Sequence, residues 1–360
     1  MAQRPLNSAP QPTLAPTIAP TVALAMGDPA GISPELMARA LHLDDLRAAA
    51  RLVVFGDRRV LAAGAAIAGV SLKIAVVTDP AEAAAGETRP IFVDLGHLDP
   101  ATIRPGEVSR AGGAFAVANF RAALKYAMAG HAQAVAFTPF NKAAMRLAHP
   151  SYEDEITFLT EEVGAEGPAS EFNILEGLWN ARVTSHVPLK DVAGLITREA
   201  VRDGLALADG AMRQAGFARP RIAVAGLNPH AGDGGNFGRE EIEVIAPAIA
   251  EAKARGIAAD GPFPSDTVFL RARAGAFDAV LTMYHDQGQI AMKLMGFDRG
   301  VTMLAGFPVP VLTPAHGTAY DIAAKGIANI GATRAAFSLA ANIAAKRLAA
   351  QEPDVRTAAG

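Results

Sequence analysis

The chain has 360 residues, of which 51% are hydrophobic and 19% charged, with a formal net charge of −3 and no cysteine. This balance is typical of a folded protein, and the length fits two domains or one bilobal α/β unit. The charge excludes the basic surface that nucleic-acid and anionic-membrane binding proteins carry. The absence of cysteine excludes disulfides, thiol nucleophiles and thiolate metal sites, and it fits a reducing compartment, so we expect a cytoplasmic protein.

The first twenty residues are rich in proline and almost uncharged. Because proline interrupts every apolar run there, we expect a disordered extension over residues 1–20 instead of a secretory signal. The longest apolar stretch, Leu61–Val70, is about half the length needed to cross a bilayer, and no membrane association is expected. Residues 21–360 are expected to form one bilobal unit with two interleaved α/β lobes.

From residue 21 on, short apolar runs alternate with longer amphipathic stretches, which predicts helices packed on a largely parallel sheet. The predicted strands are Val22–Met26, Leu52–Phe55, Leu72–Val77, Ile91–Asp94, Ala134–Phe137, Phe172–Leu175, Ala181–Thr184, Arg221–Ala225, Ala279–Met283 and Val301–Leu304. The predicted helices are Pro34–Leu41, Ala111–Ala129, Asp154–Val163, Arg198–Ala215, Arg239–Arg255 and Thr333–Ala350. No GxGxxG motif follows a predicted strand, so a dinucleotide site of the Rossmann type is not expected.

Three of the eight histidines share one context, because His186, His230 and His285 each follow shortly after a predicted strand. Ligands bind at the carboxyl ends of strands in doubly wound sheets. Three imidazoles there could hold a metal ion and leave a position open for water or substrate. A single histidine at a strand end is more often a capping or packing residue, and position alone leaves both interpretations open.

Two further segments are rich in glycine or follow a glycine turn. Gly232–Gly238 could present backbone N–H groups to an anion ahead of the helix that begins at Arg239, or it could be a flexible loop. His316–Ala323, followed by Ile327–Asn329, starts a helix after a glycine turn and is a weak signal by itself.

With these motifs in view, the chain resembles the PdxA family of 4-hydroxythreonine-4-phosphate dehydrogenases and their relatives, from about Val22 to Ile343. The resemblance is carried, in chain order, by GDPAGISPE (Gly27–Glu35), TPFNK (Thr138–Lys142), SHVPLKD (Ser185–Asp191), GLNPHAGDGG (Gly226–Gly235), GPFPSDTVF (Gly261–Phe269), MYHDQG (Met283–Gly288) and HGTAYDIA (His316–Ala323). GLNPHAG and YHDQG are specific to this group. The last segment is also similar to the cofactor-adenosine segment of isopropylmalate and isocitrate dehydrogenases. The resemblance implies a two-lobed α/β/α fold of the isopropylmalate dehydrogenase kind, not a Rossmann fold.

The resemblance also implies the site residues. The family's three metal ligands fall on His186, His230 and His285, one of them supplied by the partner in a homodimer whose active site lies at the interface. The substrate-contacting lysine falls on Lys293, and Asp266 matches an acidic residue near the reacting centre. NAD or NADP would bind the segment that contains His316, Gly317, Thr318, Asp321 and Asn329. Three nitrogen ligands favour zinc, nickel or cobalt over magnesium, and we expect zinc from its availability.

The sequence departs from the family at four of five substrate-contacting positions. Glu155 and Ile156 align with a His-Thr pair, Thr302 with an asparagine and Val311 with an arginine, whereas Lys293 is retained. Loss of the arginine removes a bidentate phosphate partner. A carboxylate ~5 Å from a phosphate charge costs roughly 3 kcal/mol at an effective dielectric constant of about 20. We therefore expect an unphosphorylated substrate, such as a cis-dihydrodiol dicarboxylate, unless a nearby cation compensates; the candidates are Lys142, Arg110 and Arg299.

The expected function is a nicotinamide- and divalent-metal-dependent dehydrogenase that oxidises a small hydroxy acid and then decarboxylates it. The first alternative is an authentic 4-hydroxythreonine-4-phosphate dehydrogenase of pyridoxal phosphate biosynthesis, with its phosphate contacts rebuilt from other residues. The second is a catalytically inert sensor that binds a metal or a small acid. The third is a magnesium-dependent malate-type dehydrogenase, but that group binds its metal through aspartates, and the three histidines argue against it.

Overall fold

The structure is a computed structural model that describes residues 19–83 and 86–351, so the expected extension over residues 1–20 lies almost wholly outside the described residues. The strands are β1 (Thr21–Ala25), β2 (Arg51–Gly56), β3 (Ala75–Val77), β4 (Ile91–Asp94), β5 (Ala134–Phe137), β6 (Ser170–Leu175), β7 (Leu178–Arg182), β8 (Ile222–Ala225), β9 (Ala259–Phe263), β10 (Ala279–Thr282), β11 (Val301–Ala305) and β12 (Val311–Pro314). They form one mixed sheet in the order β3-β4-β2-β1-β5-β12-β11-β6-β7-β10-β8-β9.

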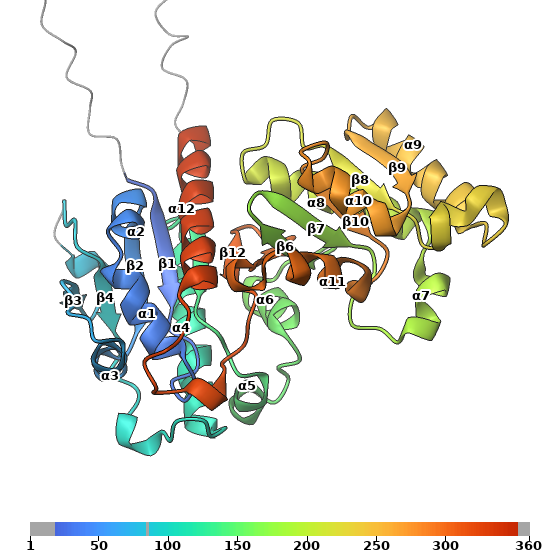
Figure 1. Ribbon diagram of the computed structural model, residues 1–360. Helices are drawn as coiled ribbons and strands as arrows, with labels where there is room; N and C mark the ends of the chain where they lie inside the picture. The colour runs from blue at the N-terminus through green and yellow to red at the C-terminus, as the bar shows by residue number, and fades with distance from the viewer. Residues whose placement is uncertain (1–18, 84–85, 352–360) are drawn as a thin grey trace, which may run out of the picture.

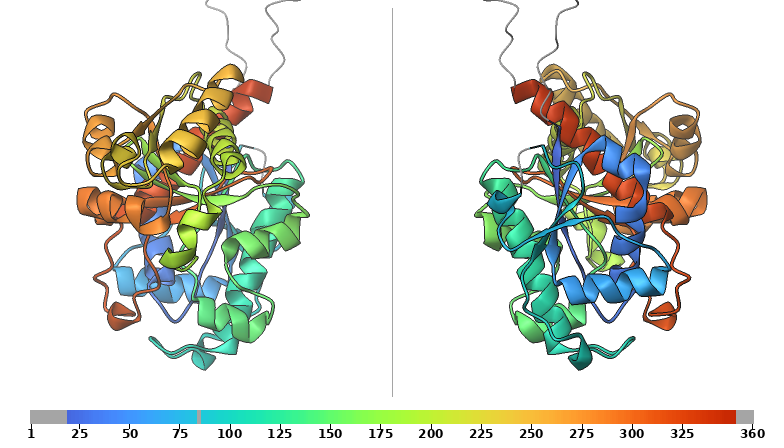
Figure 2. Two further views of the ribbon diagram at one scale, coloured as in Figure 1. Left: turned by 90° about the vertical axis from the view of Figure 1, so that its right-hand side faces the viewer. Right: turned by 90° about the vertical axis from the view of Figure 1, so that its left-hand side faces the viewer.

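The helices lie on both faces of this sheet (Figures 1 and 2). They are α1 (Ser33–His42), α2 (Asp44–Ala49), α3 (Arg58–Ala68), α4 (Arg110–Met128), α5 (Lys142–Ala148), α6 (Glu155–Val163), α7 (Leu189–Leu195), α8 (Arg198–Gln214), α9 (Ala246–Ala254), α10 (Ser265–Arg273), α11 (His285–Gly296) and α12 (Gly331–Gln351). Figure 1 shows two lobes, one around β1–β5 and one around β7–β10, and the chain returns to the first lobe through β12 and α12. Within the described ranges, no helix is long and apolar enough to span a bilayer.

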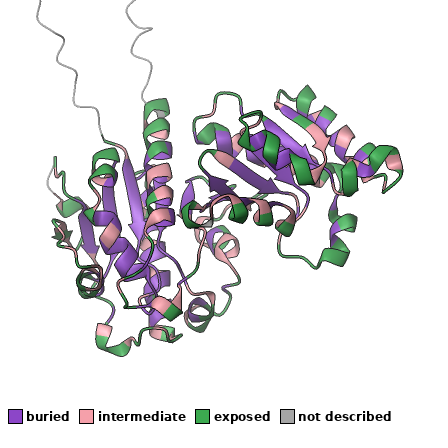
Figure 3. Cartoon of the chain, viewed as in Figure 1, coloured by how far each residue is buried: buried purple, intermediate pink, exposed green. Residues whose placement is uncertain are grey.

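The first lobe shows how local sequence sets the helices. Side-chain oxygens accept backbone N–H groups at several helix starts, which satisfies donors that the helix leaves unpaired; these caps are Asp57 for α3, Ser109 for α4, Asn141 for α5 and Asp154 for α6. The strands between them are buried on both faces, as expected where helices cover both sides of a parallel sheet (Figure 3).

The two faces of the sheet are covered differently. On one face a single apolar cluster runs through both lobes and includes Leu24, Trp179 and Phe337. On the other face the apolar cover is divided into two clusters, one in the first lobe around Phe158 and Val311, the other in the second lobe around Val280 and Met292. The centre of that second face, over β11, β6 and β7, is therefore where polar side chains can lie.

Several elements differ from the predictions. The strands β9 and β12 and the helices α2, α3, α5, α7, α10 and α11 were not expected as such. β9 contains a Gly-Pro pair and β12 follows a Pro-Val-Pro run, both of which are atypical of strands. β7 begins at Leu178, before the predicted Ala181, because it pairs with β6 directly across the turn at Glu176 and Gly177, which have φ of 48° and 88°.

Candidate active site

The predicted metal and acid residues lie on one edge of the second lobe. β7, β10, β8 and β9 run parallel to one another, so their carboxyl ends share an edge of the sheet. His186 follows β7, His285 begins α11 after β10, His230 follows β8, and Asp266 lies in the first turn of α10 after β9. The strand ends that sequence analysis selected are thus neighbours in space.

Two of the three histidines meet. The ring centroids of His186 and His285 are 5.7 Å apart, and the rings are tilted by 44°. The Nδ1 atom of His285 lies 2.7 Å from Oδ1 of Asp286, an arrangement that typically orients a metal-binding imidazole and leaves Nε2 as the ligand. These two imidazoles could supply two of the three predicted metal ligands.

His230 stands apart from this pair. It lies in the 3₁₀ segment η3 (Pro229–Gly235), and its ring is 6.2 Å from that of Phe237. In the part of the chain that the structure describes, no group of three or more His, Cys, Asp or Glu residues could hold a metal ion. The three-histidine site therefore stays a prediction.

The loop that carries His230 has an unusual backbone. His230, Ala231 and Asp233 have positive φ of 54°, 54° and 44°, a conformation that costs a residue with a Cβ roughly 1–2 kcal/mol. The buried Glu241 holds the loop by accepting the backbone N–H groups of Leu227 and Asn228, each at 2.7 Å. Such strain, held by the surrounding structure, is typical of functional sites, and it favours a fixed loop over a flexible one.

Gln287 connects the loops that carry His230 and His285. Its Nε2 donates to the carbonyl oxygen of Gly226 at 2.8 Å, and its Oε1 accepts the N–H of Met283 at 2.7 Å. The next residue, Gly288, lies so close to β7 that a Cβ there would be 2.1 Å from Oδ1 of Asn180. These contacts give a physical reason for Gln-Gly in the MYHDQG motif, which sequence analysis noted without assigning them a role.

A polar strip occupies the sheet face between the two apolar clusters. We define it as Glu171 and Asn173 on β6, Arg182 on β7 and Thr302 on β11. Thr302 pairs with Asn173 in the strand register, and Arg182 donates to Glu171 and Asn173. Arg182 is only 3% exposed, and its guanidinium contacts Glu171 at 2.9 Å; burial lowers the pKa of Arg182, and Glu171 opposes that shift. Sequence analysis missed Arg182, although an arginine at an inward position of an apolar strand is a usable signal.

The predicted substrate residues fall into two groups, one at this strip and one in the first lobe. Thr302 belongs to it, and a small cavity of about 20 Å³ is lined by Lys293 together with Asn173 and Gln289. Ile156 packs against the first-lobe cluster, and Val311 is 1% exposed within that cluster. Ile156 and Val311 therefore contribute to the core of the first lobe.

Glu155 is compensated by a cation. Nζ of Lys142, at the start of α5, lies 3.3 Å from Oε2 of Glu155, at the start of α6. Lys142 is one of the residues that could offset the glutamate. The repulsion expected between Glu155 and a phosphate is reduced accordingly.

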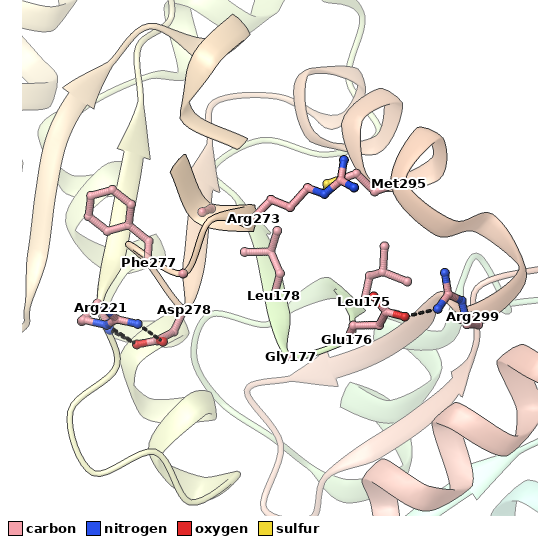
Figure 4. A pocket seen from close by; sticks show the side chains of 12 residues that line it. Leu175, Glu176, Gly177, Leu178, Arg221, Arg273, Phe277, Asp278, Met295 and Arg299 are labelled. Carbon is pink, nitrogen blue, oxygen red and sulfur yellow. Dashed lines mark hydrogen bonds and ion pairs between the residues drawn. The ribbon is translucent and has the colours of Figure 1, made fainter. Parts of the chain in front are cut away.

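Arg299, another candidate for compensation, lies elsewhere. It pairs with Glu176 on the wall of a cavity of about 390 Å³ that also includes the Arg221–Asp278 pair (Figure 4). This cavity lies where β7, β8 and β10 begin, which is the edge opposite the histidines. None of the predicted site residues lines it.

The predicted cofactor segment packs against the first lobe. The carbonyl oxygen of Thr318 accepts the N–H of Ile32 at 3.0 Å, and the Tyr320 hydroxyl donates to Asp28, whose pKa is raised by burial. Thr318 is buried, whereas Gly317, Asp321 and Asn329 are exposed. Nε2 of His316 is buried and has no partner within the described residues, so a bound nicotinamide dinucleotide could supply one. The segment is compatible with a cofactor site.

Comparisons with known proteins bear on the substrate. A Rhizobium meliloti protein provisionally named 4-hydroxythreonine-4-phosphate dehydrogenase 2 is 59% identical over 327 residues, covering 91% of this chain and 94% of its own length. A D-threonate 4-phosphate dehydrogenase of Pectobacterium atrosepticum is 37% identical over 325 residues, covering 89% of this chain and 98% of its own. Both names specify a phosphorylated four-carbon acid.

The expectation of an unphosphorylated substrate is therefore wrong. It rested on lost phosphate contacts at Glu155, Ile156, Thr302 and Val311, but relatives named for phosphorylated substrates match nearly the whole chain. The physical reason is that a different residue at a substrate-contacting position does not by itself abolish binding of a phosphate. Lys142 faces Glu155, and Ile156 and Val311 are packing residues.

Fold and family agree with the resemblance. The crystal structure of a Klebsiella pneumoniae 4-hydroxythreonine-4-phosphate dehydrogenase superposes with a TM-score of 0.81 at 36% identity, covering 91% of this chain and all of the other. This confirms the predicted α/β fold and the absence of a Rossmann arrangement. The relatives are dehydrogenases, which makes this chain an enzyme of that class. The family described as pyridoxal phosphate biosynthetic protein PdxA matches residues 48–340, and the chain belongs to that family.

Proposed function

We propose that the chain is a nicotinamide- and metal-dependent dehydrogenase of a four-carbon hydroxy acid that is phosphorylated on its terminal carbon. Candidates are 4-hydroxythreonine 4-phosphate and D-threonate 4-phosphate, after which relatives are named. The observation that carries the proposal is the pairing of His186 with His285 at the strand ends of a chain of this family. The Lys142–Glu155 pair makes a phosphorylated substrate compatible with the glutamate.

A homodimer would complete the metal site. His186 and His285 supply two nitrogen ligands, and a two-fold axis would bring His230 of a second copy to them and create two equal sites. Three imidazoles suit zinc, which we propose as the resident metal. When bound, the ion would polarise the hydroxyl that is oxidised.

The substrate's C3 hydroxyl would lose its proton, and bound NAD or NADP would supply the acceptor for the hydride from C3, which leaves a β-keto acid. The bond between C2 and the carboxylate then breaks, CO2 leaves, and C2 keeps the electron pair and takes up a proton. Asp266 would accept the hydroxyl proton, and the Lys293 ammonium would pair with the carboxylate and deliver the proton to C2. Lys293 borders the polar strip, as this role requires.

The test is an assay of the purified chain, loaded with zinc, against both phosphorylated acids and their dephosphorylated forms, with NAD and with NADP. We expect reduction of the nicotinamide with a phosphorylated acid, matched by release of one CO2 per hydride. The dephosphorylated acids are the matched controls, and comparable turnover of either would contradict the proposal. A lack of reduction with both phosphorylated acids would contradict it as well.

A further inference from the structure

The polar strip contains an ion pair, Arg182 with Glu171, between two apolar clusters. Arg182 is 3% exposed and donates to Glu171 at 2.9 Å and to Asn173 at 3.1 Å, while its Nε has no partner among the described residues. A buried ion pair contributes little to stability, because desolvation of both charges offsets their attraction. This arrangement is therefore poorly explained by stability alone.

Arg182 fixes the orientation of the Asn173 side chain. A guanidinium can only donate hydrogen bonds, so the atom of Asn173 that faces it must be the carbonyl Oδ1. Nε2 of Gln289, on α11, donates to the same oxygen at 2.7 Å. The NH2 group of Asn173 is therefore directed to the other side, where Nδ2 lies 3.4 Å from Oγ1 of Thr302.

The direction of this contact determines what Thr302 can do. A threonine hydroxyl has one hydrogen to donate and two lone pairs that accept. Because Asn173 donates to Thr302, one lone pair is used and the hydroxyl hydrogen remains for an acceptor above the sheet. Thr302 is partly exposed, so its hydroxyl can meet a ligand, whereas Asn173 and Arg182, on the neighbouring strands, are buried.

We propose that Arg182 and Asn173 are positioning residues that set the donor direction of Thr302, so that its hydroxyl donates to an anionic oxygen of the substrate. The inference deepens the proposed function and rests on it. The hydrogen-bonded series of Arg182, Asn173 and Thr302 would thus provide a polar contact to the substrate from the face of the sheet. The anionic oxygen belongs to the phosphate or to the carboxylate, and the test distinguishes the two.

The test is a double-mutant cycle with T302V and R182M, in which KM and kcat are measured for the phosphorylated substrate. A lost hydrogen bond to a charged group corresponds to a rise in KM of roughly tenfold to hundredfold, and we expect such a rise in each single variant. Because Arg182 acts through Thr302, R182M should add no further rise in the T302V background. T302S, which keeps the hydroxyl, should have the KM of the wild type.

Controls separate this role from a structural one. T313V removes the hydroxyl directly across the strand pair, which donates to the carbonyl oxygen of Phe137, and it should leave KM unchanged. If R182M does not fold, E171Q/R182M removes both charges and takes its place in the cycle. An unchanged KM in T302V, or single effects that multiply in the double variant, would overturn the proposal.

Inorganic phosphate identifies the oxygen and separates this inference from the proposed function. If the contact is to the phosphate, T302V should weaken competitive inhibition by inorganic phosphate; if it is to the carboxylate, only inhibition by the dephosphorylated acid should weaken. Weakening of neither would count against Thr302 as a contact. A wild-type chain without turnover of the phosphorylated acids refutes the proposed function alone, and calorimetric binding of these two probes then tests Thr302 directly.

Discussion

The two lobes differ in how far contacts within one chain bring the predicted site residues together. At the edge of the first lobe, the cofactor segment is held by bonds within the chain, from Tyr320 to Asp28 and from Ala328 to Glu35. At the edge of the second lobe, His186 and His285 meet, but His230 lies apart. The predicted cofactor segment is thus ordered by contacts within one chain, whereas the proposed metal site would take its third ligand from a second copy.

The largest effect is expected from subunit complementation between H230A and H285A, which tests whether the metal site is shared between two chains. Each variant by itself should lose essentially all turnover, because every site lacks one ligand. Mixed dimers should contain one intact site of two, so a statistical mixture should regain about a quarter of wild-type activity. Activity and bound zinc per dimer are the measurements. No recovery after subunit exchange, shown by mass spectrometry, would place all three ligands in one chain.

Lys142 offers a second test, because it pairs with Glu155, one of the predicted substrate-binding residues. K142M leaves Glu155 without its cation, and we expect KM for the phosphorylated substrate to rise roughly tenfold or more from uncompensated repulsion. K142M/E155Q, which removes both charges, should recover most of the loss. The same rise in both variants would show that Lys142 acts on the substrate without regard to Glu155.

Y320F tests the contact that holds the predicted cofactor segment against the first lobe. It removes the hydroxyl that donates to the buried Asp28 carboxylate, which should lower the free energy of unfolding by about 1–3 kcal/mol. Because this bond fixes the cofactor segment, KM for the nicotinamide should rise several-fold while KM for the acid stays unchanged. A rise in the KM of the acid alone would mean that the segment serves the substrate instead.

Sequence patterns located the strand ends but not the partners of the side chains there. Histidines after strands could be recognised because parallel strands place their carboxyl ends on one edge. Arg182 was not found, because its role depends on cross-strand register with β6, which periodicity does not reveal. The substrate was misjudged for a similar reason, since the contact of Lys142 with Glu155 joins two helices whose relative position the sequence alone does not give.

The smallest expected effect concerns Asp57, which lies at the carboxyl end of β2 in the first lobe. Asp57 follows β2, caps α3 and accepts the N–H of Leu98 at 3.2 Å, and hydrogen bonds from Arg59 hold its pKa at about 2. Since this lies below the ordinary value of about 3.9 for the unfolded chain, its stabilisation is present above about pH 4 and is lost as the pH falls towards 2.

D57N keeps a capping residue but removes the charge, so it should lower the free energy of unfolding near neutral pH by about 1–2 kcal/mol. Urea unfolding at about pH 7 and pH 3 measures this, and the difference between D57N and wild type should shrink at the lower pH. D79N changes an exposed capping aspartate and is the matched control. A deficit in D57N that stays constant with pH would mean that Asp57 stabilises the lobe through its shape and cap alone, not through its charge.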